Sequence, residues 1–359
     1  MAEPVPMGHA GRAMGRFGRR AALLLALLLA GTGCASDAPQ SALDPAGPYA
    51  ELLDNLFVPV FWVAVVVFVL VEGVIVYAIF KWRSKDDDDE LPAQMHGNTR
   101  LEIGWTILPA LVLGLVAVFT IPVVFKLNAE PAGALNVNVT GQQFWWGYQY
   151  DTQPAYGIVE PDGITTANEL YIPVDQDVYL TLTSRDVIHS FWAPRLNGKR
   201  DVVPGREQTW LLNASEPGAY SGQCAEFCGL SHANMRLKVV ALDQGEWEEW
   251  LATMQRDPLE PVSGLAAEGF TLFEQKGCAG CHVVDGSFES VAADAPPAPN
   301  LTHLFSRDCF AGCIYDLNDR NELEEWIRNP QRKAGSLMVV GELTEPEIDA
   351  LYAYLETLE

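Results

Sequence analysis

The most informative stretch of the chain is the loop Cys224-Ala-Glu-Phe-Cys228-Gly-Leu-Ser-His232-Ala-Asn-Met235. It brings two thiols, an imidazole and a thioether together within a short segment. Soft sulfur ligands combined with imidazole favour copper over hard cations. A blue copper site uses one cysteine, whereas two cysteines four residues apart can bridge a pair of copper ions. A copper pair of this kind transfers single electrons, so the loop predicts an electron-transfer site.

Two other interpretations of the loop are open. Cys224 and Cys228 can form a disulfide if the segment lies outside the cell, and a zinc ion needs only four such ligands. The upstream segment Asp186-Val-Ile-His189-Ser-Phe-Trp has strand character and supplies a second histidine. A lone histidine in such a run is more often a core residue. Together with the loop, however, His189 completes two cysteines, two histidines and one methionine, which favours copper.

The amino-terminal segment predicts export. A basic region is followed by an apolar run over residues 21–30, which is too short to span a bilayer and is typical of a signal peptide. Gly31-Thr-Gly-Cys34 resembles a lipoprotein cleavage box, although Gly31 stands where a large aliphatic residue is usual. We expect a signal peptide over residues 1–33 and a lipid on Cys34. The alternatives are cleavage without a lipid, or an unpaired cysteine.

Two long apolar runs, residues 57–80 and 105–125, predict a transmembrane hairpin within residues 55–126. Each run exceeds the roughly 20 residues that cross a hydrocarbon core of about 30 Å. Basic residues mark the cytoplasmic side and acidic residues count little in that rule. The loop between the runs is therefore cytoplasmic, because it contains Lys81, Arg83, Lys85 and Arg100. The short segment 34–54 and everything after Lys126 are then extracytoplasmic.

Charge narrows the choice of partners. Glu72 lies inside the first apolar run, where a carboxylate is costly unless it faces protein or water. It either packs against a larger membrane subunit or lies close enough to the inner edge to be wetted. The formal net charge of −24 argues against nucleic acid and for basic or neutral partners, although such charge is often only a solvated surface.

Residues 127–254 have the character of an all-β domain. Apolar and polar residues alternate in runs such as 137–140 and 178–183, and turn residues such as Asn197-Gly198 separate the runs. Several short strands at this spacing predict an antiparallel sandwich or barrel. The metal-binding loop falls between the last two strands, as in a cupredoxin. A short helix over residues 247–254 and a linker over residues 255–264 follow.

A second cofactor motif, Cys278-Ala-Gly-Cys281-His282, follows a predicted helix over residues 265–276. C-x-x-C-H is the signature of covalent c-type haem attachment, in which the histidine is an axial iron ligand. A thioredoxin-like redox pair is the alternative, but no βαβ pattern surrounds the motif. Residues 265–359 are therefore expected to be an all-α cytochrome c domain.

The second axial ligand is expected to be Met338, in the loop between predicted helices over residues 322–328 and 345–358. A methionine ligand raises the haem potential, which suits a donor to copper. His303 is the rival and would give a lower-potential haem. Cys309 and Cys313 are expected to form an additional disulfide.

Taken together, these motifs resemble subunit II of haem–copper cytochrome c oxidases that carry a fused cytochrome c domain. The resemblance covers nearly the full mature chain and implies a relay from haem to the copper pair, and then to subunit I, where oxygen is reduced and protons are pumped. It implies that the copper centre is held by His189, Cys224, the backbone carbonyl of Glu226, Cys228, His232 and Met235. It also implies a magnesium ion, shared with subunit I, near the Glu226 side chain.

The resemblance implies two further features. Glu102 stands where the family has a glutamate at the mouth of a proton channel; an ordinary interfacial carboxylate is the alternative. Phe144, in Gln143-Phe-Trp145-Trp146, stands where many members have the tryptophan that receives electrons from soluble cytochrome c. A tethered haem would make that route unnecessary, because a short flexible linker gives an effective concentration on the order of millimolar.

The implied partners are subunit I, other membrane subunits, and a donor such as a cytochrome c or an upstream respiratory complex. This places the chain in a bacterial cell membrane, with both cofactor domains outside the cytoplasm. Two other functions are open. A membrane-tethered copper-delivery protein explains the soft ligands but not the covalent haem, and the electron-transfer subunit of a nitrogen-oxide reductase would share the relay.

Overall fold

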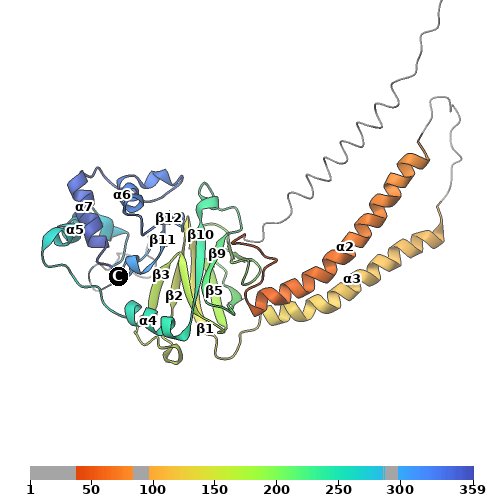
Figure 1. Cartoon of the computed structure of the whole chain (residues 1–359), viewed down its shortest axis with the longest axis horizontal. Coiled ribbons are helices and arrows are strands. Elements are labelled where there is room, and N and C mark those ends of the chain that lie inside the picture. Colours follow the sequence, from red (N-terminus) through yellow and green to blue (C-terminus); the bar gives the residue numbers. More distant parts are fainter. Residues whose placement is uncertain (1–37, 84–96, 286, 288–297) are drawn as a thin grey trace, which may run out of the picture. The chain divides into compact units, whose positions relative to one another are not determined.

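The computed structural model describes residues 38–83, 97–285, 287 and 298–359. The predicted signal peptide and Cys34 lie outside these residues and stay predictions. Within the described residues the chain forms a hairpin of long helices, a β-sandwich and a carboxyl-terminal part built mainly of helices (Figure 1). The predicted fold class is confirmed.

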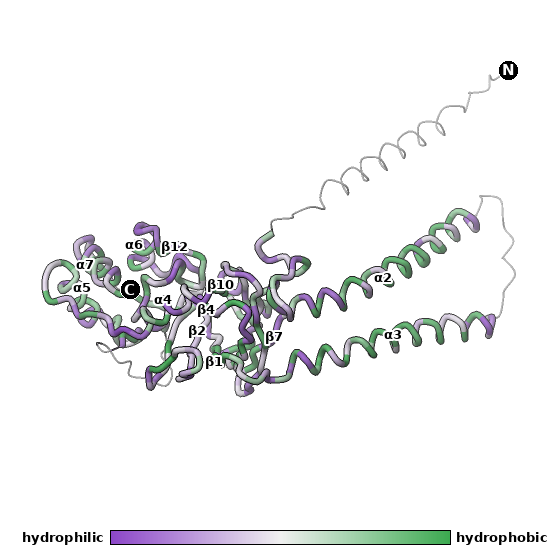
Figure 2. Tube along the Cα trace, turned by 60° about the horizontal axis from the view of Figure 1, so that its bottom comes forward, coloured by the Kyte–Doolittle hydropathy of each residue, from purple (hydrophilic) through white to green (hydrophobic). Residues whose placement is uncertain are grey.

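The hairpin consists of α2 (Pro48–Lys81) and α3 (Thr99–Leu127), which contact one another over only a small part of their length. Both helices are long and apolar enough to cross a membrane, and their most apolar windows are not buried by protein (Figure 2). The Asn98 side chain begins α3 by accepting hydrogen bonds from the Arg100 and Leu101 amides. Glu72 is exposed on α2, so none of the described residues covers it.

The sandwich is built from two five-stranded sheets, with strand orders β3-β2-β1-β5-β8 and β4-β10-β9-β6-β7. Burial alternates along the strands, as in β1, so that every second side chain faces the core. The bounds are β1 Leu135–Gln142, β2 Trp145–Tyr150, β3 Ile164–Ala167, β4 Glu169–Pro173, β5 Val178–Ser184, β6 His189–Trp192, β7 Arg200–Val202, β8 Gln208–Leu212, β9 Gly218–Cys224 and β10 Arg236–Leu242.

The prediction of a purely antiparallel sandwich is wrong at two strand pairs. β1 pairs with β5 in parallel, with Leu135 opposite Val178, and β10 pairs with β4 in parallel, with Lys238 opposite Glu169. Parallel neighbours need a long crossover connection. Strands β2 to β4 provide that crossover between β1 and β5, and local alternation of residues does not reveal it.

The carboxyl-terminal helices lie close to their predicted positions. They are α4 (Gln244–Met254), α5 (Gly264–Gln275), α6 (Arg320–Arg328) and α7 (Glu345–Leu355), and the short strands β11 (Cys309–Phe310) and β12 (Tyr315–Asp316) precede α6. α5 crosses α7 at Gly269, where an added Cβ would lie 1.9 Å from the Ala350 carbonyl oxygen. Glycine therefore permits this close helix packing.

The sandwich core should depend on the buried face of β5. Replacing the fully buried Leu180 with alanine should lower the free energy of unfolding by about 2–5 kcal/mol, because it removes apolar contact and leaves a cavity. Thr181→Ala, on the opposite face of the same strand, should cost less than about 1 kcal/mol. Denaturant unfolding followed by tryptophan fluorescence measures both. Equal losses would contradict this assignment of the core face.

Candidate metal centre and haem pocket

The ends of the predicted metal-binding loop are fixed by the pairing of two strands. β9 ends at Cys224 and β10 begins directly after Met235, and the two strands are antiparallel neighbours. The Cys224 amide donates to the Met235 carbonyl over 2.8 Å. Both side chains are buried, so the loop is closed at its base inside the protein.

His189 reaches the same place from a neighbouring strand. It begins β6, and β6 pairs with β9 so that Phe191 lies opposite Cys224. The His189 ring is buried, and its Nδ1 lies 3.8 Å from the Cys224 sulfur. Residues 35 positions apart in the sequence therefore contribute to one site.

The remaining predicted ligands surround the two sulfurs. Cys228 Sγ lies 3.8 Å from each of three atoms: Cys224 Sγ, His232 Nδ1 and Met235 Sδ. The Glu226 carbonyl oxygen lies 3.2 Å from Cys224 Sγ. A disulfide between Cys224 and Cys228 is excluded here, because both thiols are free and their separation is far above a bond of about 2.05 Å.

The hydrogen bonds of His189 prepare it as a ligand. Its Nε2 lies 2.8 Å from Asp186 Oδ1, and a carboxylate only accepts, so Nε2 carries the proton. That leaves the Nδ1 lone pair facing the sulfurs. Such an outer partner fixes the tautomer and orientation of a metal-binding histidine. Sequence reasoning assigned no role to Asp186, and only its position three residues before His189 could have indicated one.

The donor set fits a pair of soft metal ions. The hydrogen bond between the two sulfurs lowers the pKa of the Cys224 thiol, which favours one thiolate in the pair. Two thiolates, two imidazoles, one thioether and one carbonyl exceed the four ligands of a structural zinc ion. They suffice for two ions that share both sulfurs, and copper suits such ligands.

The haem motif lines a separate cavity of about 420 Å³, which lies within the roughly 300–1,000 Å³ usual for ligand pockets. Cys278, Cys281, His282 and Met338 all border it, although Met338 is more than 50 positions from the motif. Trp326 on α6 also borders the cavity and contacts Phe310. The four residues expected to hold haem are therefore brought together.

The two histidines of this region are in different situations. His282 Nδ1 lies 2.8 Å from the Pro299 carbonyl oxygen and must donate to it, which leaves Nε2 free as a metal ligand. His303 is absent from the described residues that line the cavity, and its Nδ1 bonds the Glu359 carbonyl over 2.9 Å. The geometry favours Met338 over His303 as the second ligand.

A buried arginine in the cavity was missed by sequence reasoning. Arg307 borders the cavity, its Nη2 donates to the Asn300 carbonyl, and its Nε has no partner among the described residues. Burial lowers the pKa of Arg307 to about 10. A haem carries propionate carboxylates, and a buried guanidinium with an unused donor fits one of them. Nothing in the sequence around Arg307 distinguishes it from the other arginines of the chain, so its place in the cavity could not be predicted.

One wall of the haem cavity belongs to the sandwich. Gln143, Phe144 and Trp145 border the cavity. The Gln143 side chain donates to the Cys228 carbonyl over 2.5 Å, and its amide donates to Asp186 Oδ2 over 2.7 Å. Trp146 is fully buried, with its ring edge-on to His189. The aromatic stretch therefore lies between the two candidate cofactor sites.

Three other residues singled out in the sequence remain. Cys309 and Cys313 form the expected disulfide. Glu102 lies exposed in the first turn of α3. Its position at the end of the hairpin fits either the proton-channel role or an ordinary interfacial carboxylate.

Known protein families match three segments of the chain. Residues 36–123 match the transmembrane domain of cytochrome c oxidase subunit II, and residues 135–242 match its periplasmic domain. Residues 266–359 match the cytochrome c family. The three segments coincide with the hairpin, the sandwich and the carboxyl-terminal helices.

Whole proteins match over similar lengths. Cytochrome c oxidase subunit 2 of Alkalihalophilus pseudofirmus is 39% identical, over 91% of this chain and 93% of that protein. The Bacillus subtilis protein of the same name is 35% identical, over 95% and 98%. Among solved structures, the periplasmic domain of cytochrome oxidase subunit II from Bradyrhizobium japonicum is 28% identical, with a TM-score of 0.31, over 35% of this chain and 96% of that one. The chain belongs to the cytochrome c oxidase subunit II family and carries a cytochrome c domain at its carboxyl end.

Proposed function

We propose that this chain is the electron-accepting subunit II of a respiratory cytochrome c oxidase, which passes electrons from a covalent c-type haem through a dinuclear copper centre to subunit I. One observation carries the proposal most directly. Gln143 borders the haem cavity and also donates a hydrogen bond to the carbonyl of Cys228, so the two cofactor sites share a wall. Oxygen reduction and proton pumping belong to subunit I.

The copper pair would be held by His189, Cys224, Cys228, His232 and Met235, with the Glu226 carbonyl as the sixth donor. Bound copper would supply a one-electron carrier. The protein's own contribution is to bury His189, Cys224, Cys228 and Met235 and to fix the site by the pairing of β6, β9 and β10, so that the donor positions change little with oxidation state. The Glu226 side chain would meet a magnesium ion shared with subunit I.

The haem would be bonded to Cys278 and Cys281, with His282 and Met338 as axial ligands. The Pro299 carbonyl orients the His282 ring by accepting its Nδ1 proton. Arg307 offers its free Nε to a propionate inside the cavity. A methionine ligand raises the haem potential, as an electron donor to copper requires.

The partners follow from the family and from the two spans. The hairpin would place the chain twice across a bacterial cell membrane, with both cofactor domains on the extracytoplasmic side. Subunit I and other membrane subunits would cover its exposed apolar helices, including the carboxylate of Glu72. The external donor would be a cytochrome c or an upstream respiratory complex.

Exchanging cysteines in each motif should separate the two cofactors. Cys224→Ser should abolish the paramagnetic signal of the mixed-valence copper pair and leave the haem spectrum intact. The double variant Cys278→Ser with Cys281→Ser should abolish the covalently bound haem and leave the copper signal intact, because it removes both thioether bonds and no copper ligand. Both should stop turnover of the assembled oxidase with oxygen. A copper signal that survives Cys224→Ser would sink the site assignment, and silent Cu(I) in the wild type would favour a delivery protein.

Exchanging the two candidate axial ligands should discriminate between them. Met338→Ala should shift the haem absorption spectrum and lower its potential, because a thioether ligand is lost. His303→Ala should leave both unchanged, since His303 bonds a backbone carbonyl outside the cavity. Spectroelectrochemical titration of both variants measures this. The opposite pattern would assign His303 as the ligand.

Glu102 would serve as the mouth of a proton channel shared with subunit I. Glu102→Gln keeps the size of the side chain but cannot exchange a proton, and should slow oxygen consumption by the whole oxidase severalfold. The haem and copper spectra should not change. Glu130→Gln, which removes an exposed carboxylate just beyond α3, is the matched control. Equal rates in the two variants would leave Glu102 as an interfacial carboxylate.

A further inference from the structure

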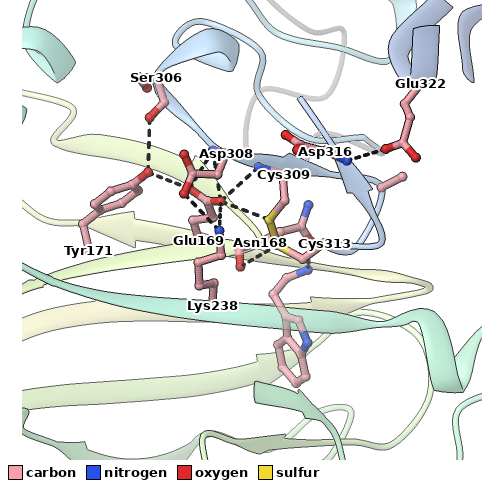
Figure 3. Close-up of a disulfide and its surroundings, with 12 residues drawn as sticks. Asn168, Glu169, Tyr171, Lys238, Ser306, Asp308, Cys309, Cys313, Asp316 and Glu322 are labelled. Carbon is pink, nitrogen blue, oxygen red and sulfur yellow. Dashed lines mark hydrogen bonds and ion pairs between the residues drawn. A yellow bond between two sulfur atoms is a disulfide. The ribbon is translucent and has the colours of Figure 1, made fainter. Parts of the chain in front are cut away.

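The cytochrome c domain contacts the sandwich through a small loop, residues 309–313, which the disulfide between Cys309 and Cys313 closes (Figure 3). The Gly312 carbonyl accepts a hydrogen bond from the Arg236 amide over 3.0 Å. Arg236 directly follows the predicted copper ligand Met235. A backbone hydrogen bond therefore joins the disulfide loop to the base of the metal-binding loop.

The tip of this loop has an unusual backbone. Ala311, Gly312 and Cys313 have φ angles of 52°, 79° and 51°, in the left-handed region. This region costs a residue with a Cβ roughly 1–2 kcal/mol, whereas glycine adopts it freely, so Ala311 and Cys313 need support from a covalent closure or from contacts. An added Cβ on Gly312 would lie 2.5 Å from the Asn234 carbonyl oxygen. The tip therefore fits closely against the metal-binding loop.

A buried carboxylate of the sandwich accepts hydrogen bonds from backbone amides at the start of the disulfide loop. Glu169, on β4, is 0% exposed. It accepts hydrogen bonds from the Asp308 and Cys309 amides, at 3.1 and 3.0 Å, and from the Tyr171 hydroxyl, and it pairs with Lys238 (Figure 3). Two of its donors, the Asp308 and Cys309 amides, belong to the cytochrome c domain. The buried carboxylate of Glu169 therefore has all its hydrogen bonds only when the two domains are in contact.

A buried lysine of the cytochrome c domain completes the contact. Lys333 is 4% exposed, and its Nζ donates to the Phe144 carbonyl of the sandwich over 2.8 Å and to the Ala311 carbonyl over 2.7 Å. Burial lowers the pKa of Lys333 to about 7. The next residue, Ala334, accepts a hydrogen bond from the Ser231 hydroxyl of the metal-binding loop. Met338 lies on the same short segment.

Contacts of this kind select one orientation. A buried charged or polar group costs free energy unless its partners are in place, and such groups contribute more to specificity than to affinity. Glu169 and Lys333 each take partners from both domains. A small rotation of the cytochrome c domain would take from each side chain its partners in the other domain, and would remove the Lys333 donor from the Phe144 carbonyl and the Arg236 donor from the Gly312 carbonyl.

We propose that residues 309–313, Glu169 and Lys333 form a docking clasp that holds the cytochrome c domain on the sandwich in a single orientation. The inference rests on the proposed relay and sharpens it. Electrons would pass within a docked pair of domains, and not through repeated encounters of a domain swinging on the linker. Glu169 and Lys333 are positioning residues, because they act through the placement of the haem and copper ligands.

Hydrogen exchange on the full-length chain tests the clasp without any turnover. The Arg236, Asp308 and Cys309 amides should exchange slowly in the wild type, because each is bonded across the contact. Lys333→Met, Glu169→Gln and the double variant Cys309→Ser with Cys313→Ser should each raise these rates by about tenfold or more. Amides of the β1–β5 pair should not change. Wild-type amides that exchange as fast as exposed ones would overturn the proposal.

Transient electron transfer provides a second readout in the assembled oxidase. After photoreduction of the haem, the wild-type rate of copper reduction should be independent of solvent viscosity, whereas a swinging domain would slow as viscosity rises. The three variants should show slower, viscosity-dependent transfer, because the haem would have to return to its position beside the copper ligands before each transfer. A wild-type rate that falls with viscosity would overturn the clasp even if every variant misfolded.

Arg320→Met is the matched control for Lys333→Met. It also removes one positive charge, but Arg320 pairs with Glu324 and Asp349 inside the cytochrome c domain. Exchange and transfer rates should stay at wild-type values, and a loss equal to that of Lys333→Met would make the effect one of charge alone. Failure of the proposed function gives a different result, namely no transfer from haem to copper at any viscosity while the exchange pattern persists.

Discussion

The pairing of β9 with β10 is the constraint on which the rest of this protein depends. In this pairing the Cys224 amide donates a hydrogen bond to the Met235 carbonyl, so the two ends of the intervening loop lie side by side at the edge of the strands. The loop returns so that the Cys228 sulfur lies beside the Cys224 sulfur, and His232 lies beside Cys228. The neighbouring strand β6 then adds His189. A set of soft ligands is thus brought together by ordinary sheet hydrogen bonds.

Much of this arrangement could be predicted from the sequence because it is local. The spacing from Cys224 to Met235, the C-x-x-C-H motif and the two apolar runs each carry their chemistry within a short segment. What could not be predicted depends on long-range topology. The parallel pairing of β1 with β5 follows from a crossover, not from alternation. Met338 could be proposed only as one of two candidates, since its place in the cavity depends on how α6 and α7 pack.

Two carboxylates that sequence reasoning missed, Asp186 and Glu169, contact residues far along the chain. Asp186 orients His189 and also holds the Gln143 amide. Glu169 accepts hydrogen bonds from residues some 140 positions away. A carboxylate or lysine in isolation is usually a solvated surface residue, and only the structure shows that the side chains of Glu169 and Lys333 are buried. Polar groups buried in this way are informative because they need their partners.

Gln143 shows why the orientation of the two domains matters. Its amide and side chain bond the two halves of the metal site, through Asp186 to His189 and directly to the Cys228 carbonyl, while the residue itself borders the haem cavity. A freely tethered haem would meet this wall only part of the time, and a high effective concentration does not by itself fix geometry. The cavity includes sandwich residues only because Lys333 and the disulfide loop hold the domains together. The linker therefore limits the distance of the cytochrome c domain from the sandwich, and the buried contacts determine its orientation.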